Sequence, residues 1–306
     1  MADEKRRYRL RWVDVFTDRP LAGNPLAVVL EADGLSDTQM QAIARETNLS
    51  ETTFVLPPEN REHAARVRIF TPHAELPFAG HPTVGTSWVL LDEGLVGSSA
   101  DGFILEEGVG PIDVRIDRGR GEVVLWMSHP PVRFGEVIDE REDIAAALGL
   151  TVADLRSEVP IQVVSTGVPF VFVALNDAAA VDRAIASGEA LTSVLDPHGL
   201  PPVFLFAVVA ADRFYSRMFG PHSSTRIVED PATGSASGPL GAFAVRYDLV
   251  PRAAELSLLS EQGTRMGRQS FIHIKLAYPT EAEVPSKIEV GGSVRPVMTA
   301  ELSISG

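Results

Sequence analysis

One carboxylate in the first half of the chain has a position suited to moving a proton. Glu51 stands at the head of Thr52–Leu56, a short apolar segment typical of a buried strand. Partial burial there would raise the pKa of its carboxyl group toward the range of a general acid–base catalyst. Position alone favours the simpler interpretation, in which Glu51 is an exposed carboxylate at a strand end. Burial of the side chain is the property that distinguishes the catalytic interpretation from this one.

Two nearly uncharged segments of the chain each follow a glycine and a polar residue, Gly80-His81 in one case and Gly234-Ser235 in the other. If both segments are helices, the first N–H groups of each have no partner within the helix, and the dipole is positive there. Such a helix start binds small anions readily. His81 lies directly at the first start, and Asp230 with Ser235 brackets the second.

Each of these three side chains also has an ordinary structural interpretation. Asp230 and Ser235 belong to the residue types that most often cap helices. His81 could be a core histidine with its hydrogen bonds satisfied. The occurrence of all three at equivalent entrances of two apolar helices favours a binding site for a small carboxylate.

The segments that follow these glycines, residues 82–91 and 236–245, carry scarcely a charge on any face. A helix that is apolar all round must be buried on all sides. Pro82 suits the first turn of a helix, whereas Pro239 weakens the second prediction. We therefore expect two central helices, each wrapped by a strongly curved sheet.

An internal repeat relates the two halves of the chain. The segment Arg68–His73 recurs as Arg217–His222, an offset of 149 residues (217 − 68 = 149), and each copy leads into one of the two glycines. Upstream, Asn24–Val29 is more faintly similar to Val168–Val173. Two copies of about 150 residues predict a duplication and two domains.

The expected fold class is therefore α+β, with two similar domains, each a β-barrel-like mixed sheet around a central buried helix. The prolines of Ser128–Val132 make it the best linker, so the domains are expected at 1–127 and 128–294. A capping box at Ser36 and Gln39 predicts a helix from Asp37 to Glu46. Short strands are expected at residues 52–56, 66–70, 163–164, 170–173, 203–206 and 297–304.

Composition excludes several classes of function. The chain has 306 residues, 27 basic and 41 acidic, and its formal charge of −14 makes nucleic acid an unsuitable partner. No run of about eighteen apolar residues is present and the first residues lack a secretory signal, so we expect a cytoplasmic protein that does not bind membranes. With no cysteine, thiolate zinc sites and paired-thiol racemisation are excluded.

The histidines show no metal-ligand spacing, and no metalloprotease, Walker A or dinucleotide-binding signature is present. We therefore expect no metal and no cofactor. Any acid–base chemistry has to come from carboxylates, histidines, hydroxyls or lysines.

Four segments give the chain a family likeness that spans nearly its whole length: Leu21–Val28 (LAGNPLAV), Asn48–Phe54 (NLSETTF), Phe70–Pro82 (FTPHAELPFAGHP) and Val228–Pro239 (VEDPATGSASGP). They resemble the PhzF-like isomerases of phenazine biosynthesis. The resemblance implies the diaminopimelate-epimerase-like fold, with the active site in the cleft between the domains. It also implies that the last strand, 295–306, returns to the first domain and that the protein is a homodimer.

The resemblance assigns roles to the residues in these motifs. It implies that Glu51 is the general acid–base and that His81 and Asp230 are its polar partners. It also implies that Ser235 binds the substrate and that Gly80 and Gly234 offer backbone N–H groups to it. Related epimerases use two cysteines. This chain has none, so only a carboxylate version of the chemistry is open.

The function implied is a cofactor-independent isomerase that moves a proton on an anionic small molecule, such as trans-2,3-dihydro-3-hydroxyanthranilate or a related carboxylate. Two alternatives stay open. One is a two-base epimerase or racemase of a small amino or hydroxy acid, with Glu51 opposed to Asp230. The other is a dimeric carboxylate-binding protein without catalysis.

Overall fold

The computed structural model describes residues 6–221, 228–280 and 282–304. The chain divides into two compact units, residues 1–128 with 291–306, and residues 129–290. His222, the last residue of the second repeat copy, lies outside the described residues.

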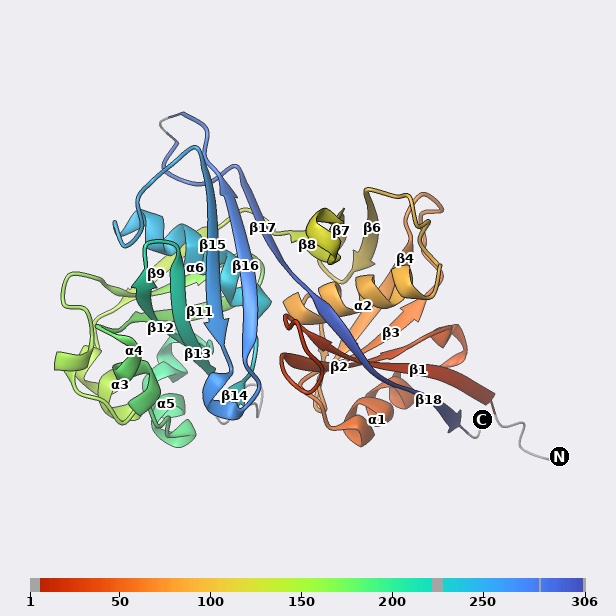
Figure 1. Cartoon of the computed structure of the whole chain (residues 1–306). Coiled ribbons are helices and arrows are strands. Elements are labelled where there is room, and N and C mark those ends of the chain that lie inside the picture. Colours follow the sequence, from red (N-terminus) through yellow and green to blue (C-terminus); the bar gives the residue numbers. More distant parts are fainter. Residues whose placement is uncertain (1–5, 222–227, 281, 305–306) are drawn as a thin grey trace. The chain divides into compact units, whose positions relative to one another are not determined.

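Unit 1 consists mainly of strands, with the α-helices α1 and α2 (Figure 1, red to yellow, with β18 in blue). Its elements are β1 (Arg6–Val15), β2 (Asn24–Val29), α1 (Asp37–Thr47), β3 (Thr52–Leu56), β4 (Ala65–Phe70), β5 (Glu75–Leu76), α2 (Gly80–Asp92), β6 (Gly102–Glu107), β7 (Gly110–Asp117), β8 (Val124–Ser128) and β18 (Val294–Ile304). The last strand, β18, pairs antiparallel with β1 along its whole length.

Unit 2 has more helices (Figure 1, green to blue). Its elements are β9 (Arg133–Ile138), α3 (Arg141–Ala147), β10 (Ile161–Ser165), β11 (Pro169–Ala174), α4 (Ala178–Arg183), α5 (Gly188–Leu195), β12 (Val203–Ala210), β13 (Arg213–Phe219), β14 (Glu229–Asp230), α6 (Gly234–Arg246), β15 (Glu255–Gln262), β16 (Ser270–Ala277) and β17 (Lys287–Gly292), whose last two residues belong to unit 1.

The strand pairing of unit 1 is repeated in unit 2. The parallel pairs β2–β3 and β4–β6 correspond to β11–β12 and β13–β15. The antiparallel pairs β1–β2, β3–β4, β4–β5 and β6–β7 correspond to β10–β11, β12–β13, β13–β14 and β15–β16. In both units the long central helix follows the two-residue strand. The predicted duplication is therefore confirmed at the level of topology.

The repeated Arg-hydrophobic-Phe segment has the same role in both units. Arg68 of β4 makes a bidentate ion pair with Glu75 of β5, with both N···O distances 2.7 Å. Arg217 of β13 pairs in the same way with Glu229 of β14, at 2.8 and 2.9 Å. A bidentate guanidinium–carboxylate pair fixes geometry as well as charge, so it locks the short strand that leads to each central helix.

The central helices are buried as expected. Every residue of α6 from Gly234 to Val245 is buried, and α2 is buried from Gly80 to Ser87. In unit 2 the sheet residues alternate between two cores because side chains along a strand point to opposite faces. On β11 and β12 the phenylalanines face α6, where Phe172 stacks on Phe243 at 5.4 Å, while valine and leucine face α3, α4 and α5.

Short local signals predicted several elements accurately. The helix α1 begins after Ser36, whose side chain and that of Gln39 form the expected capping box. The helix ends at Thr47, one residue beyond the prediction, because Asn48 adopts the left-handed conformation that stops it. The strand at 52–56 has the predicted bounds, and the strands expected at 163–164, 170–173, 203–206 and 297–304 lie within longer ones.

The architecture is α+β, with two similar units, each a mixed sheet around a buried helix, as the sequence predicts. None of the helices in the described part of the chain has both the length and the apolar character needed to cross a bilayer.

The packing of α2 against the sheet depends on a glycine. A Cβ atom at Gly85 would lie 2.6 Å from Leu26 Cδ2 and 2.7 Å from Val15 Cγ2, both in fully buried side chains. We predict that Gly85→Val lowers the free energy of unfolding by about 3 kcal/mol through overpacking. In the control Gly97→Val, a Cβ meets nothing within 4 Å, and we expect a change within about 0.5 kcal/mol. Urea unfolding of both variants measures the difference, and equal stabilities would contradict the packing argument.

Candidate functional site

Glu51 is held at the junction of α1 and β3. The left-handed Asn48 turns the chain after α1, and the hydroxyls of Thr47 and Thr52 are 2.7 Å apart, which ties the helix end to the strand start. Within β3 all five residues are buried, between parallel β2 and antiparallel β4. Glu51 itself is only 8% exposed. The alternative of an exposed carboxylate at a strand end is therefore wrong.

His81 is the second residue of α2 and lies against Glu51. Its side chain is buried, and its Nε2 atom is 3.5 Å from Glu51 Oε2. That distance is longer than a strong hydrogen bond, but the two groups are in contact across a buried space. The hydroxyls of Thr53 on β3 and Thr86 on α2 are 2.8 Å apart, so the strand and helix that carry the two groups are joined directly.

The protonation of His81 follows from its surroundings. Burial lowers the pKa of its imidazole to about 3, so the ring is neutral at physiological pH. The side-chain amide nitrogen of Asn24 lies 3.1 Å from Nδ1. Because an amide nitrogen only donates, Nδ1 accepts and the ring carries its proton on Nε2. His81 thus presents an N–H group to the Glu51 carboxylate.

In unit 2, a compact network holds the loop that precedes α6. Thr233 Oγ1 donates to Asp230 Oδ2 at 2.6 Å. Gln262, at the end of β15, accepts from the Thr233 backbone N–H at 2.9 Å and donates to the Asp230 carbonyl oxygen at 2.7 Å. Asp230 is 5% exposed and Ser235 is 8% exposed. The network therefore fixes a carboxylate and a hydroxyl at a buried helix start.

The capping interpretation of Asp230 and Ser235 is wrong. The residue that precedes α6 is Thr233, and no side chain caps the helix there. Ser235 is the second residue of α6, as His81 is of α2, and Gly80 and Gly234 are the first residues of their helices. No side chain caps α2 either. The two glycines therefore stand where backbone N–H groups lack intrahelical acceptors.

The structure brings the predicted residues together in two groups, one in each unit. Glu51, Gly80 and His81 share unit 1, and Asp230, Gly234 and Ser235 share unit 2. Sequence reasoning did not select Asn24, Thr233 or Gln262, which orient these groups. The signal for Asn24 was its place in the LAGNPLAV motif, whereas Gln262 lies in a strand without a recognisable motif.

The second copy of the repeat has a different residue at the position equivalent to Glu51. Thr52 pairs with Ala27 across β3 and β2, and Val203 pairs with Val171 across β12 and β11, with Ala27 and Val171 at equivalent repeat positions (171 − 27 = 144). The residue before β12 is Pro202, so the second copy has no carboxylate at the position equivalent to Glu51. The carboxylate at this position therefore belongs to one copy of the repeat.

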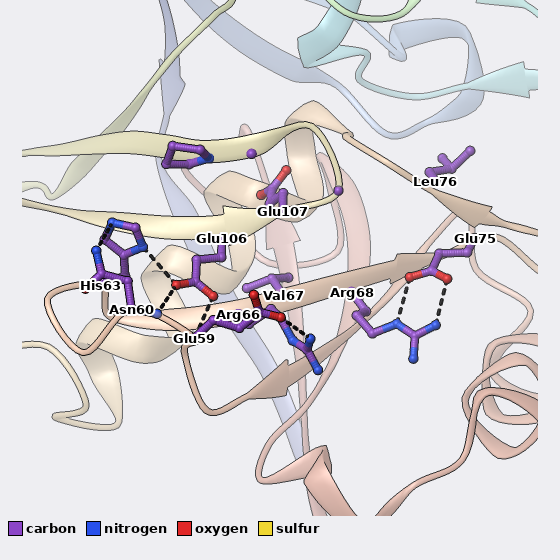
Figure 2. A pocket seen from close by; sticks show the side chains of 13 residues that line it. Glu59, Asn60, His63, Arg66, Val67, Arg68, Glu75, Leu76, Glu106 and Glu107 are labelled. Atoms are coloured by element: carbon purple, nitrogen blue, oxygen red, sulfur yellow. Dashed lines mark hydrogen bonds and ion pairs between the residues drawn. The ribbon is translucent and has the colours of Figure 1, made fainter.

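A separate pocket of about 510 Å³ lies on unit 1 beside β4, β5 and the β6–β7 hairpin (Figure 2). Most of its charged side chains are paired with one another: His63 with Glu106, Arg66 with Glu59 and Arg68 with Glu75. None of the predicted site residues lines it.

In the described part of the chain, no group of three or more histidine, aspartate or glutamate side chains is arranged to hold a metal ion.

Comparisons with known proteins agree on one family. Residues 13–300 match the PhzC-PhzF model, described as phenazine biosynthesis-like protein. A trans-2,3-dihydro-3-hydroxyanthranilate isomerase of Pseudomonas aeruginosa is 37% identical over 282 residues, 92% of this chain and 94% of that one. An uncharacterized isomerase of Mesorhizobium japonicum is 41% identical over 275 residues, covering 86% and 88%.

A solved structure supports the same conclusion. The phenazine biosynthesis protein of the PhzF family from Bacillus anthracis superposes with a TM-score of 0.89 and 29% identity, over 98% of this chain and 100% of that one. The fold that the sequence motifs implied is thereby confirmed.

Two histidines, the buried His81 and the partly buried His129, should make the protein sensitive to acid. Burial lowers the pKa of both His81 and His129 to about 3, so between that pH and 6.5 the unfolded chain binds protons that the folded chain does not. Stability therefore falls as pH decreases through this window, by roughly 1.4 kcal/mol per pH unit for each histidine. We predict that His81→Gln and His129→Gln each remove one histidine's contribution to this pH dependence of the free energy of unfolding. Urea unfolding between pH 6.5 and 4 measures the change. An unchanged slope in both variants would contradict the prediction.

Proposed function

The chain is an isomerase of the phenazine biosynthesis-like (PhzC-PhzF) family, and on that premise we propose that Glu51 moves a proton on an anionic small molecule as the general acid–base. The observation that carries the proposal is the contact between Glu51 and His81. A buried carboxylate faces the N–H group of a neutral imidazole, and both lie at the start of an enclosed helix.

The proposed reaction is a proton transfer within the substrate. The Glu51 carboxylate removes a proton from one carbon, and the electron pair left behind shifts along the substrate. The same proton then returns from the Glu51 carboxylic acid to a different carbon, so atoms and charge balance without another reactant. His81 assists because its Nε2–H lies 3.5 Å from Glu51 Oε2 and can donate to the carboxylate when the substrate binds, which would orient the attacking oxygen.

The low dielectric of the buried site strengthens each of these interactions. The first-turn N–H groups of α2, which begins at Gly80, are suited to stabilise the negative charge that develops on the substrate. Because these donors are fixed by the fold, they need no reorganisation when the charge appears.

The start of α6 suits the binding of a carboxylate group. Gly234 supplies a backbone N–H at the positive end of the helix dipole, and the Ser235 hydroxyl is a further donor. The hydrogen bond from Thr233 leaves Asp230 with a fixed orientation, in which its carboxylate can accept from a donor group on a substrate such as an amine or a hydroxyl.

For the substrate we propose trans-2,3-dihydro-3-hydroxyanthranilate or a related carboxylate, since that compound is named for the Pseudomonas aeruginosa relative. It carries a carboxylate, an amine and a hydroxyl, which match the donor and acceptor types in the two groups of residues. A two-base epimerase is less well supported, because the repeat offers Pro202 where Glu51 stands and Asp230 is already bound by Thr233.

Glu51→Gln tests the proposal. The amide keeps the size of the side chain but cannot take a proton, so we expect kcat to fall by about 10²–10⁴-fold. The measurement is proton NMR in deuterated buffer with trans-2,3-dihydro-3-hydroxyanthranilate and a panel of small amino and hydroxy acids. Glu46→Gln, an exposed change on α1, is the control and should keep full turnover.

The same spectra separate the alternatives. A shifted double bond with a hydrogen newly bound to another carbon supports the isomerase, whereas deuterium exchange at one carbon with loss of configuration supports the two-base epimerase. Binding of a panel member without any exchange would indicate a carboxylate-binding protein. Full turnover by Glu51→Gln would refute the role of Glu51.

A further inference from the structure

A second buried carboxyl group lies behind the first turn of α2. Glu107 is the last residue of β6, is 7% exposed and lies in the pocket of Figure 2. Its Oε1 atom is 2.6 Å from Thr83 Oγ1. Its Oε2 atom is buried and has no hydrogen-bond partner among the described residues. An ionised carboxylate in that position would leave a buried charge without compensation.

Counting hydrogens shows which group donates. Thr83 Oγ1 also lies 2.7 Å from the Ala79 carbonyl oxygen, which can only accept, so the single hydroxyl hydrogen of Thr83 is used there. The short contact between Thr83 and Glu107 then needs its hydrogen from the carboxyl group. A protonated Glu107 completes a chain from its own O–H through Thr83 to the Ala79 carbonyl at the start of α2.

The charges around Glu107 are engaged elsewhere. On β4, Arg66 pairs with Glu59, and Arg68 pairs with Glu75 and Asp37; in the adjoining loop His63 pairs with Glu106. On α2, His81 is neutral. Burial raises the pKa of Glu107 from 4.5 to about 8. Among the residues that the structure describes, no cation lowers the cost of ionising Glu107.

The second copy of the repeat has a neutral side chain at the equivalent position. Arg66 pairs with Glu106 across β4 and β6, and Tyr215 pairs with Glu261 across β13 and β15, at the repeat offset of 149 (215 − 66 = 149). The next residues along the strands are therefore equivalent, Glu107 and Gln262.

Gln262 is fully buried and holds the start of α6 through Thr233 and Asp230. Glutamine has the shape of a protonated glutamic acid. The duplication thus fills both positions with uncharged side chains of the same shape, each bonded to the turn that begins a central helix.

We propose that Glu107 is a positioning residue of this enzyme: as a neutral carboxylic acid it fixes, through Thr83, the first turn of α2 that carries Gly80 and His81. Loss of its proton places a buried negative charge behind the helix start and removes the donor to Thr83. Substrate binding should then weaken, because the substrate proposed above is an anion. The catalytic part of this inference rests on the proposed function, but the protonation of Glu107 does not.

Infrared spectroscopy of the intact protein in deuterated buffer tests the protonation directly. At pH 7 we expect a carbonyl band of a protonated carboxylic acid, absent from Glu107→Gln and lost from the parent protein above pH 8. The matched variant Gln262→Glu should gain a second band, since the same acid is then placed in the second copy. A parent spectrum without a band that Glu107→Gln removes would overturn the proposal, whatever the substrate proves to be.

Stability gives an independent readout of the same proton. Between pH 4.5 and about 8 the folded chain retains a proton at Glu107 that the unfolded chain releases, so this group destabilises the fold as pH rises. The difference in Tm between Glu107→Gln and the parent should therefore increase in favour of the variant from pH 5 to pH 8. A constant difference across that range would contradict the neutral acid.

The pH profile of turnover tests the positioning role. Above pH 8, kcat/KM of the parent should fall relative to Glu107→Gln, by up to about tenfold per pH unit, mainly through KM. Glu107→Leu keeps the pocket filled but loses the hydrogen-bond donor, so it should lower turnover at every pH. Higher turnover in Glu107→Gln than in Glu107→Leu would show that the hydrogen bond to Thr83, and not the packing of the side chain, is what turnover requires. If Glu107→Gln keeps the alkaline decline of the parent, the positioning role is refuted even where the infrared band confirms the acid. If the parent turns over no substrate, the proposed function fails and the infrared result still stands.

Discussion

The enclosure of a helix start inside a sheet is the constraint on which the rest of the structure depends. Because α2 and α6 are surrounded by their own units, the first N–H groups of each helix and the polar residues beside them are kept away from bulk water. Each buried polar atom must then find a partner within the fold, since an unsatisfied one costs about 1–3 kcal/mol. In the candidate site, Asn24 meets this requirement for His81 Nδ1, and Thr233 and Gln262 meet it for the loop at Asp230.

The two copies of the repeat supply partners for their buried polar groups in different ways. In unit 1, Asn24 accounts for one nitrogen of His81 and the other faces Glu51, so burial produces a neutral imidazole beside a carboxylate. In unit 2, Gln262 and Thr233 close a network around the Asp230 loop. The same scaffold thus places a carboxylate and a neutral imidazole at one helix start and a bound carboxylate with a hydroxyl at the other.

This asymmetry within a duplicated fold is informative about mechanism. The bidentate arginine–glutamate pairs and the strand pairing are repeated, which indicates that both copies need the same support for the short strand before the helix. Two chemically distinctive positions are not repeated: the position of Glu51 is equivalent to that of Pro202 in the other copy, and the position of Glu107 is equivalent to that of Gln262. A duplicated scaffold can therefore keep its packing while the side chains at equivalent positions differ in their chemistry.

The sequence by itself determined the elements whose signals are local. The capping box of α1, the strand at 52–56, the uncharged central helices and the repeat all follow from residue type and spacing, and the motifs identify the family. Only the tertiary structure decided that Glu51 is buried, which nitrogen of His81 carries the proton and that Gln262 holds the second helix start. These properties depend on contacts between residues that are distant along the chain, as Asn24 and His81 are, and on exclusion of water by the whole sheet. A local pattern carries no information about either, because hydrogen-bond partners and dielectric are set by what surrounds a residue rather than by what precedes it.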